Sequence, residues 1–268
     1  MNSYKVKCDM LKLAMEQYAE EHIMVAFSGG VDSSLLLALA CEGVVKTGRK
    51  VYAATLHTML HPVAELENAK VVAEELGAVH IVIEVDELEE AGILNNPVDR
   101  CYRCKKCLFE KVLEKAKKLK VPYILEGTNE DDLHVYRPGI KAVHELGVKS
   151  PLAEAGMTKY EVRRLAAEYG VSSSNRPSTP CLATRFPYGT VLSYEKMKKV
   201  EKGESYLKDM GFYNVRIREH GDIARIEVDL KEIPVVIEQK QEIVSYLKGL
   251  GYRYVTIDLE GFRSGSMD

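Results

Sequence analysis

The chain has 268 residues, of which 46% are hydrophobic and 29% charged, and its formal net charge is −3 at pH 7. This is the composition of a folded globular protein, and the charge gives no general attraction to nucleic acid or membranes. No run is long and apolar enough to span a bilayer, and the first ten residues lack the apolar core of a signal peptide. We therefore expect a cytoplasmic protein without a membrane partner.

Strands and helices alternate through the first half of the chain. Strands are expected at 22–27, 50–58, 79–85 and 121–127, and helices at 8–21, after 30, at 62–76 and at 102–120. The polar segment 86–100 is expected to be a loop. This alternation predicts an α/β fold with a parallel sheet covered by helices on both faces. Such sheets bind ligands at the carboxyl ends of their strands.

The pattern changes in the last third of the chain. A helix at 157–170 has a capping box formed by Thr158 and Glu161, and Gly170 ends it. A proline-rich loop follows. Beyond it the expected order is α-β-β-α-β, with elements at 193–210, 213–220, 222–229, 232–249 and 253–259 and a hairpin at Gly221. We therefore expect domains at 1–188 and 189–268, the second a small α+β domain for substrate binding or oligomerisation.

The sequence Ser-Gly-Gly-Val-Asp-Ser, residues 28–33, lies where the first strand ends and a helix begins. Its glycines permit positive φ and close backbone approach, and the helix start directs unpaired N–H groups at an anion. The hydroxyls of Ser28, Ser33 and Ser34 add donors. The loop has no lysine and is not a Walker A motif. The alternative is a plain strand-to-helix turn with a polar cap.

Four of the six cysteines stand in settings that suggest chemistry. Cys101, Cys104 and Cys107 are spaced by three, and Cys181 lies in the proline-rich loop. In a reducing compartment such bunching indicates metal or redox chemistry rather than a disulfide framework. One alternative is a structural zinc site with Cys181 as the fourth ligand. Cys8 and Cys41, on amphipathic or leucine-rich stretches, are expected to be buried and without function.

The loop 28–33 resembles the signature of the PP-loop ATP pyrophosphatases, whose domain is adenine nucleotide alpha hydrolase-like. Longer segments, among them RCYRCKKCLF, GTNEDD, PSTPCLATRFPYG and LEGFRSGSMD, resemble the LarE family over almost the whole chain. That resemblance implies an ATP-dependent sulfurtransferase of nickel-pincer nucleotide biosynthesis that forms AMP and pyrophosphate. It implies a small-molecule nucleotide substrate, pyridinium-3,5-biscarboxylate mononucleotide, whose carboxylate becomes a thiocarboxylate. It also implies a sulfide donor and a homo-oligomer.

The resemblance assigns roles to individual residues. Its cofactors are ATP, Mg²⁺ and a [4Fe–4S] cluster that delivers sulfide. Asp32 and Cys181 are the catalytic residues, and the cluster ligands are Cys101, Cys104 and Cys181, with Cys107 as an extra thiol that leaves the ligand set open. Residues implied for pyrophosphate, Mg²⁺ and nucleotide binding are Ser28, Gly29, Gly30, Asp32, Ser33, Gly127, Thr128 and Asn129.

The residues themselves are consistent with this chemistry. Adenylation gives a carboxylate a good leaving group, and the nucleophile must then be a thiolate or sulfide. Arg176 and Arg185 would favour the thiolate of Cys181 by their positive charge. In a version of the family without a cluster, Cys181 itself is consumed and becomes dehydroalanine.

Two arginines of the second domain are candidates for binding the substrate phosphate. Arg216 and Arg218 are two apart on an expected strand and therefore share one face, as paired guanidinium groups on a phosphate require. Cross-strand salt bridges are the alternative. Glu204 and Glu227 are candidates for a divalent cation nearby. A tRNA thiolase with the same ATP chemistry would need a larger nucleic-acid footprint than this charge provides, and a non-catalytic regulator would not need Asp32 and Cys181.

Overall fold

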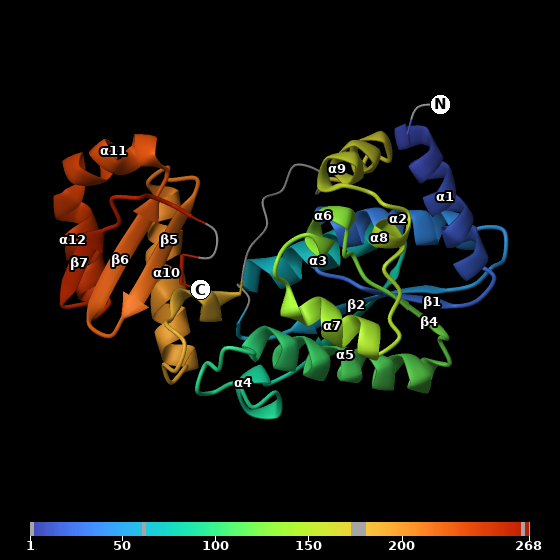
Figure 1. Cartoon of the computed structure of the whole chain (residues 1–268), viewed down its shortest axis with the longest axis horizontal. Helices are drawn as coiled ribbons and strands as arrows, with labels where there is room; N and C mark the ends of the chain where they lie inside the picture. The colour runs from blue at the N-terminus through green and yellow to red at the C-terminus, as the bar shows by residue number, and fades with distance from the viewer. Residues whose placement is uncertain (1–2, 61–62, 173–180, 264–265, 268) are drawn as a thin grey trace. The chain divides into compact units, whose positions relative to one another are not determined.

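The computed structural model describes residues 3–60, 63–172, 181–263 and 266–267, and the chain divides into two compact units (Figure 1). The first unit comprises residues 1–92 and 99–179, and the second comprises 93–98 and 180–268. Segment 93–98 is tied to the second unit by backbone bonds from Gly189 N to Asn96 O at 3.0 Å and from Leu192 N to Leu94 O at 2.8 Å. The second unit is therefore assembled from two separate parts of the chain.

The first unit is built on a four-stranded, fully parallel sheet in the order β3-β2-β1-β4. Its strands are β1 (Ile23–Ala26), β2 (Val51–His57), β3 (Val79–Glu84) and β4 (Tyr123–Leu125). The parallel sheet expected from the sequence is thus confirmed. Because β1 lies between β2 and β4, the loops that follow β1 and β4 emerge next to each other at the carboxyl end of the sheet.

Helices cover both faces of this sheet, as expected (Figure 1). Successive residues of β1 point to opposite faces, so Ile23 and Val25 pack into one apolar core and Met24 into the other. The first core is formed with α1 (Ser3–Tyr18), α2 (Val31–Val44), α3 (Val63–Glu75), α8 (Pro151–Glu154) and α9 (Lys159–Glu168). The second is formed with α5 (Arg100–Leu119) and α7 (Pro138–Glu145).

Short helices account for most differences from the expected elements of the first unit. Segment 86–100, expected to be a loop, contains α4 (Glu87–Glu90), and α6 (Glu130–Leu133), α7 and α8 precede α9. They begin at local signals, an Asp86 or Asn129 cap or a proline in the first turn, rather than from a long apolar period. The capping box of Thr158 and Glu161 at the start of α9 is confirmed.

The second unit contains a three-stranded sheet in the order β5-β6-β7. β5 (Val215–His220) and β6 (Ile223–Val228) form the expected hairpin with Gly221 at a φ of 65°, and β7 (Tyr254–Ile257) pairs with β6 in parallel. α10 (Tyr194–Asp209) packs closely on β5, because a side chain at Gly203 would meet Ile217 at 2.5 Å.

The prediction of a single helix over 232–249 is wrong. Two helices, α11 (Ile233–Glu238) and α12 (Lys240–Gly249), are separated at Gln239, whose ψ of 14° departs from helical geometry. Two 3₁₀ turns, η1 (Leu182–Arg185) and η2 (Leu230–Glu232), complete the unit. In the described ranges of the chain, no helix has the length and apolar character needed to cross a membrane.

Candidate functional site

Hydrogen bonds of two serines hold the loop between β1 and α2 in shape. Ser33 Oγ accepts a hydrogen bond from Ser28 N at 3.3 Å and donates one to Gly30 O at 3.1 Å. Gly29 has a φ of 72°, and a Cβ there would lie 2.7 Å from the Asn68 side chain of α3. These contacts hold the turn ahead of the first N–H groups of α2, an arrangement suited to a polyphosphate.

Ser34 is fully buried in the first turn of α2, and its hydroxyl has no hydrogen-bond partner among the described residues. Its role as a phosphate donor stays a prediction. The donors at the turn itself are the hydroxyls of Ser28 and Ser33, which lie 3.2 Å apart.

The loop after β4 lies directly against the start of α2. A Cβ at Gly127 would come within 2.9 Å of Asp32 Cβ and 3.1 Å of Ser33 N, so only glycine permits this approach. Asn129 Nδ2 donates to Asp32 Oδ1 at 3.2 Å. Thr128 donates through its N–H and hydroxyl to the buried carboxylate of Glu126, at 3.0 and 2.9 Å. The two predicted nucleotide loops therefore meet at Asp32.

Lys159 is a member of this site that the sequence analysis missed. Its ammonium group forms an ion pair with Asp32 Oδ2, and its backbone N–H donates to Asp131 Oδ2 at 2.8 Å. The available signal was the capping box, since it makes Lys159 the first residue of α9. A cation beside Asp32 supplies the positive charge that the loop itself lacks.

Three cysteines lie on the first turns of α5. Cys101 is exposed, whereas Cys104 and Cys107 are half-buried, and burial raises the pKa of the Cys107 thiol. Cys104 Sγ donates to Glu87 Oε1 at 3.8 Å. Glu87 is fully buried in the stretch expected to be a solvated loop, and desolvation raises its pKa to about 7. The burial of Glu87 could not be expected from the sequence, because its neighbours are mostly acidic.

Cys181 precedes the 3₁₀ turn η1 in the second unit and is partly exposed. Its carbonyl accepts hydrogen bonds from Arg185 Nη1 at 3.1 Å and Thr184 Oγ1 at 2.8 Å. Arg185 is 1% exposed and pairs with Glu204 through two bonds of 2.9 Å. Arg185 therefore positions the backbone of Cys181. Its effect on the thiol stays a prediction, and Arg176 lies outside the described residues.

The predicted cluster ligands belong to different units. Cys101 and Cys104 are in the first and Cys181 is in the second, so a shared cluster stays a prediction. Across the described parts of both units, no three His, Cys, Asp or Glu side chains form a group that could hold a metal ion. Thiols on successive turns of one helix, one of them exposed, do match the soft donors that iron–sulfur clusters and zinc both require.

The predicted phosphate-binding arginines lie on one face of the small sheet. Arg218 is 4% exposed and pairs with Glu227, while Arg216 donates to the Val215 carbonyl at 2.7 Å. Burial and the neighbouring charges of Arg185 and Arg218 lower the pKa of Arg216. Glu227 is bound by arginines, as is Glu204, so neither carboxylate offers the open ligand expected for a divalent cation.

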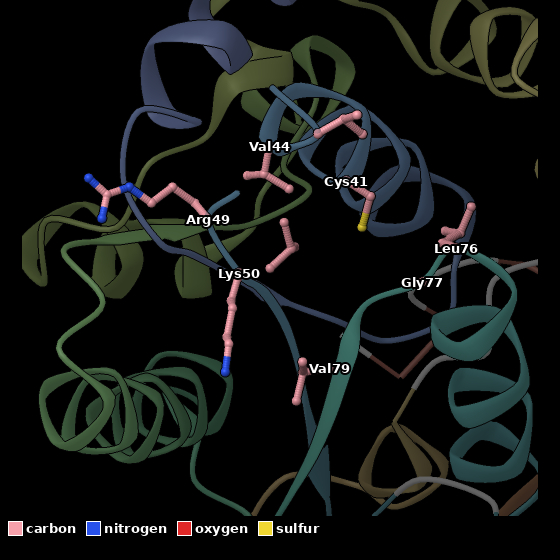
Figure 2. A pocket seen from close by; sticks show the side chains of 9 residues that line it. Cys41, Val44, Arg49, Lys50, Leu76, Gly77 and Val79 are labelled. Carbon is pink, nitrogen blue, oxygen red and sulfur yellow. The ribbon is translucent and has the colours of Figure 1, made fainter. Parts of the chain in front are cut away.

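A pocket of about 360 Å³ lies at the other end of the first unit, among the C-terminus of α2 and the starts of β2 and β3 (Figure 2). Cys41 directs its sulfur toward this pocket, and burial raises the pKa of its thiol to about 11. The thiol is thus protonated at neutral pH. Because the pocket lies at the amino ends of the strands, it is separate from the loops that meet at Asp32.

Known proteins resemble both units of this chain. A model of the PP-loop domain family matches residues 3–134. Pyridinium-3,5-bisthiocarboxylic acid mononucleotide synthase of Lactiplantibacillus plantarum is 38% identical over 248 residues, 92% of this chain and 89% of that protein. An uncharacterized protein of Synechocystis is 36% identical over 92% of both chains. A tRNA-specific 2-thiouridylase of Rickettsia bellii is 24% identical over 68% of this chain and 59% of that enzyme, a weaker and shorter match.

Proposed function

Because this chain belongs to the LarE family of the PP-loop superfamily, we propose that it is an ATP-dependent sulfurtransferase acting on a pyridinium mononucleotide carboxylate. The observation that carries the proposal is the meeting of the loops after β1 and β4 at Asp32. The relative from Lactiplantibacillus plantarum is named for a bisthiocarboxylic acid mononucleotide product, which supports the carboxylate as the group that receives sulfur.

The first step of the proposed reaction activates the carboxylate. A carboxylate oxygen attacks the α-phosphorus of ATP, the bond to the β-phosphate breaks, and pyrophosphate leaves. The N–H groups at the start of α2 and the hydroxyls of Ser28 and Ser33 hold the pyrophosphate. Asp32 would supply a carboxylate ligand for Mg²⁺, and Lys159, which pairs with Asp32, would add positive charge next to the phosphates.

The second step places sulfur on the activated carbon. A sulfur nucleophile forms a bond to the acyl carbon, and the bond from that carbon to AMP breaks. The products are AMP and a thiocarboxylate. The hydrogen bonds from Arg185 and Thr184 to the carbonyl of Cys181 support a fixed backbone position for this residue. Cys181 itself is partly exposed.

The proposed ligands of a [4Fe–4S] cluster are Cys101, Cys104 and Cys181. Three thiolates leave one iron of a cubane without a protein ligand. When bound, the cluster supplies the sulfide that becomes the thiocarboxylate sulfur. Two alternatives use the same residues, namely a structural zinc site and a Cys181 that gives up its own sulfur.

The second unit is proposed to hold the substrate phosphate through Arg216 and Arg218. Within the described part of the chain, no carboxylate lies within ion-pair distance of Arg216. This half-buried residue is repelled by the charges of Arg185 and Arg218, an effect that Glu204 and Glu227 oppose. An anion would relieve that repulsion. Changing Arg216 and Arg218 to Ala should raise the substrate KM and leave ATP binding unchanged; an equal loss of ATP affinity would contradict this role.

The ATP step is tested by product analysis. Incubation with ATP, Mg²⁺ and the biscarboxylate mononucleotide should release AMP and pyrophosphate, and Asp32→Ala should abolish turnover because the Mg²⁺ ligand is lost. Asp9→Ala is the matched control, since it removes an exposed carboxylate from α1. Release of ADP and phosphate as the main products would contradict the proposal.

The sulfur source is tested on protein purified without oxygen. We expect a coloured protein containing iron and sulfide, which Cys101→Ser, Cys104→Ser and Cys181→Ser each lose together with multiple turnover. Cys107→Ser should retain the cluster and serve as the control. A colourless protein loaded with zinc would support the structural site. A single turnover with the mass of one H₂S lost at Cys181 would support a sacrificed cysteine.

A tRNA thiolase is the second candidate, from the weaker match to the thiouridylase. It is distinguished by substrate: AMP release that depends on tRNA, and not on a carboxylate mononucleotide, would favour it. The net charge of −3 provides little of the electrostatic attraction that a tRNA substrate requires.

A further inference from the structure

The C-terminal residues after β7 lie on the same sheet that carries the arginine pair. Asp258 N donates to Ile226 O at 2.9 Å, and Phe262 N donates to Val228 O at 2.7 Å, so this segment is attached along β6. Gly261 has a φ of 70°, and a Cβ there would lie 2.9 Å from Val228 O. The segment therefore approaches the strand as closely as backbone permits.

Glu227 is the centre of a network that includes this segment. Its carboxylate is fully buried and accepts hydrogen bonds from Arg218 Nε at 2.9 Å, Arg225 Nη2 at 3.1 Å and Ser266 Oγ at 2.6 Å. The Ser266 bond is directed at Oε1, the same oxygen that Arg225 contacts. Among the described residues, Ser266 is the neutral donor to this carboxylate beside two arginines, and it brings the C-terminal segment to the ion pair.

Arg216 contacts an aromatic ring, whereas Arg218 contacts a carboxylate. Its strand neighbour across the sheet is Glu227, yet its guanidinium group lies over the ring of Phe262, 5.1 Å from the centroid. The Phe262 ring limits where that guanidinium group can go, as the Glu227 carboxylate limits Arg218. Both arginines are therefore oriented by contacts with residues outside β5.

Glu227 holds one edge of the Arg218 guanidinium group. Arg218 Nε and Nη2 are engaged by the carboxylate, Nη2 also donates to Arg263 O at 3.5 Å, and Nη1 donates to Thr184 O at 3.0 Å. A guanidinium group held on these sides keeps one orientation, and the second N–H of Nη1 is the donor left for a phosphate oxygen. Any motion of the Glu227 carboxylate is passed to Arg218.

We infer that Ser266 is a positioning residue for the phosphate monoester of the substrate, acting through Glu227 on Arg218, while Phe262 orients Arg216. The C-terminal residues Phe262 and Ser266 thus complete the phosphate subsite from outside the strands that bear the arginines. The inference rests on the proposed function in one respect, namely that this arginine pair takes the substrate phosphate.

The test measures binding of inorganic phosphate to the full chain by calorimetry, with Mg²⁺ and α,β-methylene-ATP present to occupy the first unit. Ser266→Ala should weaken phosphate binding about tenfold, because a hydrogen bond to a buried charged group is lost. Ser266→Thr retains the hydroxyl and should stay within twofold of the wild type. Arg216→Ala should abolish the binding, which identifies the site.

A matched control removes a charge from the same segment at a residue that forms no hydrogen bond or ion pair with Glu227, Arg216 or Arg218. Glu260 is exposed and pairs with Arg263, so Glu260→Ala should bind phosphate like the wild type. Affinity for α,β-methylene-ATP should be equal in all variants, since a local effect does not reach the first unit. If the alanine variant unfolds, Ser266→Cys provides the same comparison with a weak donor of similar size.

Three results would overturn the inference: wild-type affinity in Ser266→Ala, equal weakening in Ser266→Thr, or binding that survives Arg216→Ala. The proposed function fails separately. If phosphate binding follows the expected pattern but the biscarboxylate mononucleotide gives no AMP or pyrophosphate, the positioning role of Ser266 stands and the assigned reaction is wrong.

Discussion

The regions that we assign to ATP and to the substrate phosphate are built from different materials. In the first unit, the loops after β1 and β4 are shaped by glycines that permit close approach, and their donors are mainly backbone N–H groups and hydroxyls. In the second unit, charged side chains are buried in ion pairs on one face of a sheet. The first region depends on the path of the backbone, and the second depends on the pairing of opposite charges.

The difference predicts how each region fails. A backbone site tolerates changes of polarity nearby but no added atoms, because an extra Cβ moves the loop. A site of buried charges tolerates small changes of shape, but removal of one partner leaves a charge uncompensated. The sharpest tests of the comparison are therefore mutations that add an atom to the first region and mutations that remove a charge from the second.

The largest effect is expected for Glu204→Gln. Its partner Arg185 is buried, so loss of the carboxylate charge should lower the free energy of unfolding by about 3 kcal/mol or more, measured by urea denaturation. The double variant Arg185→Met, Glu204→Leu should recover much of that loss. Glu21→Gln is the control, because its pair with Arg49 is exposed and contributes less than about 1 kcal/mol. If Glu204→Gln and Glu21→Gln lower the free energy of unfolding equally, the buried pair is no more important for stability than the exposed one.

Glu87→Gln tests the one buried carboxylate of the first unit whose pKa is raised to about 7. Because the folded-state pKa exceeds the usual value of 4.5, ionisation costs stability, and this cost grows as pH rises from about 4.5 to about 7. Relative to the Gln variant, the wild type should therefore lose roughly 3 kcal/mol over that range. Denaturation of metal-free protein at several pH values measures it.

The exposed Glu89→Gln is the control for that series and should leave the pH dependence unchanged. A wild type whose stability, compared with Glu87→Gln, does not change between pH 4.5 and 7 would show that Glu87 ionises normally.

Gly127→Ala should act on catalysis more than on folding. The new Cβ would lie 2.9 Å from Asp32 Cβ and displace the carboxylate that we propose to bind Mg²⁺, so AMP formation should fall about 100-fold. Gly249→Ala is the matched control, since a Cβ there meets nothing within 4 Å. Pyrophosphate release assays measure both. Near wild-type activity in Gly127→Ala would mean that the loop after β4 is not part of the ATP site.

The smallest effect is expected for Thr158→Ala, which removes the cap in front of Lys159. The free energy of unfolding should fall by about 1 kcal/mol. The KM for ATP should rise, because Lys159 loses its fixed place beside Asp32. Thr158→Ser should restore both values. A stability loss without any change in KM would separate the helix cap from the ATP site.

Sequence patterns predicted the regular parts of this fold well. The four parallel strands and the hairpin at Gly221 follow from apolar runs and turn residues, and they are present. The break at Gln239 was missed, because no glycine or proline stands at that position to mark it. The short helix at Glu87 was missed because an acidic tetrapeptide is usually solvated, whereas here it closes a buried contact with Cys104.

Site residues were predictable where their spacing is local. The serines and glycines of the phosphate loop are contiguous, and Arg216 and Arg218 alternate on one strand. Lys159 lies 127 residues from Asp32, and the bond from Ser266 to Glu227 spans 39 residues, so no short pattern indicates either pair. Only the packing of the chain reveals which distant polar groups become partners.

The inclusion of segment 93–98 in the second unit has a practical consequence for anyone who would study the halves apart. Asn96 donates to the carbonyls of Phe186 and Pro187 at 3.1 and 2.8 Å and is itself fully buried. A fragment that begins near residue 180 lacks this asparagine, and the complementary fragment carries it without its acceptors. No single cut releases an intact half, so transplanting the second unit onto another protein requires a circularly permuted or discontinuous design.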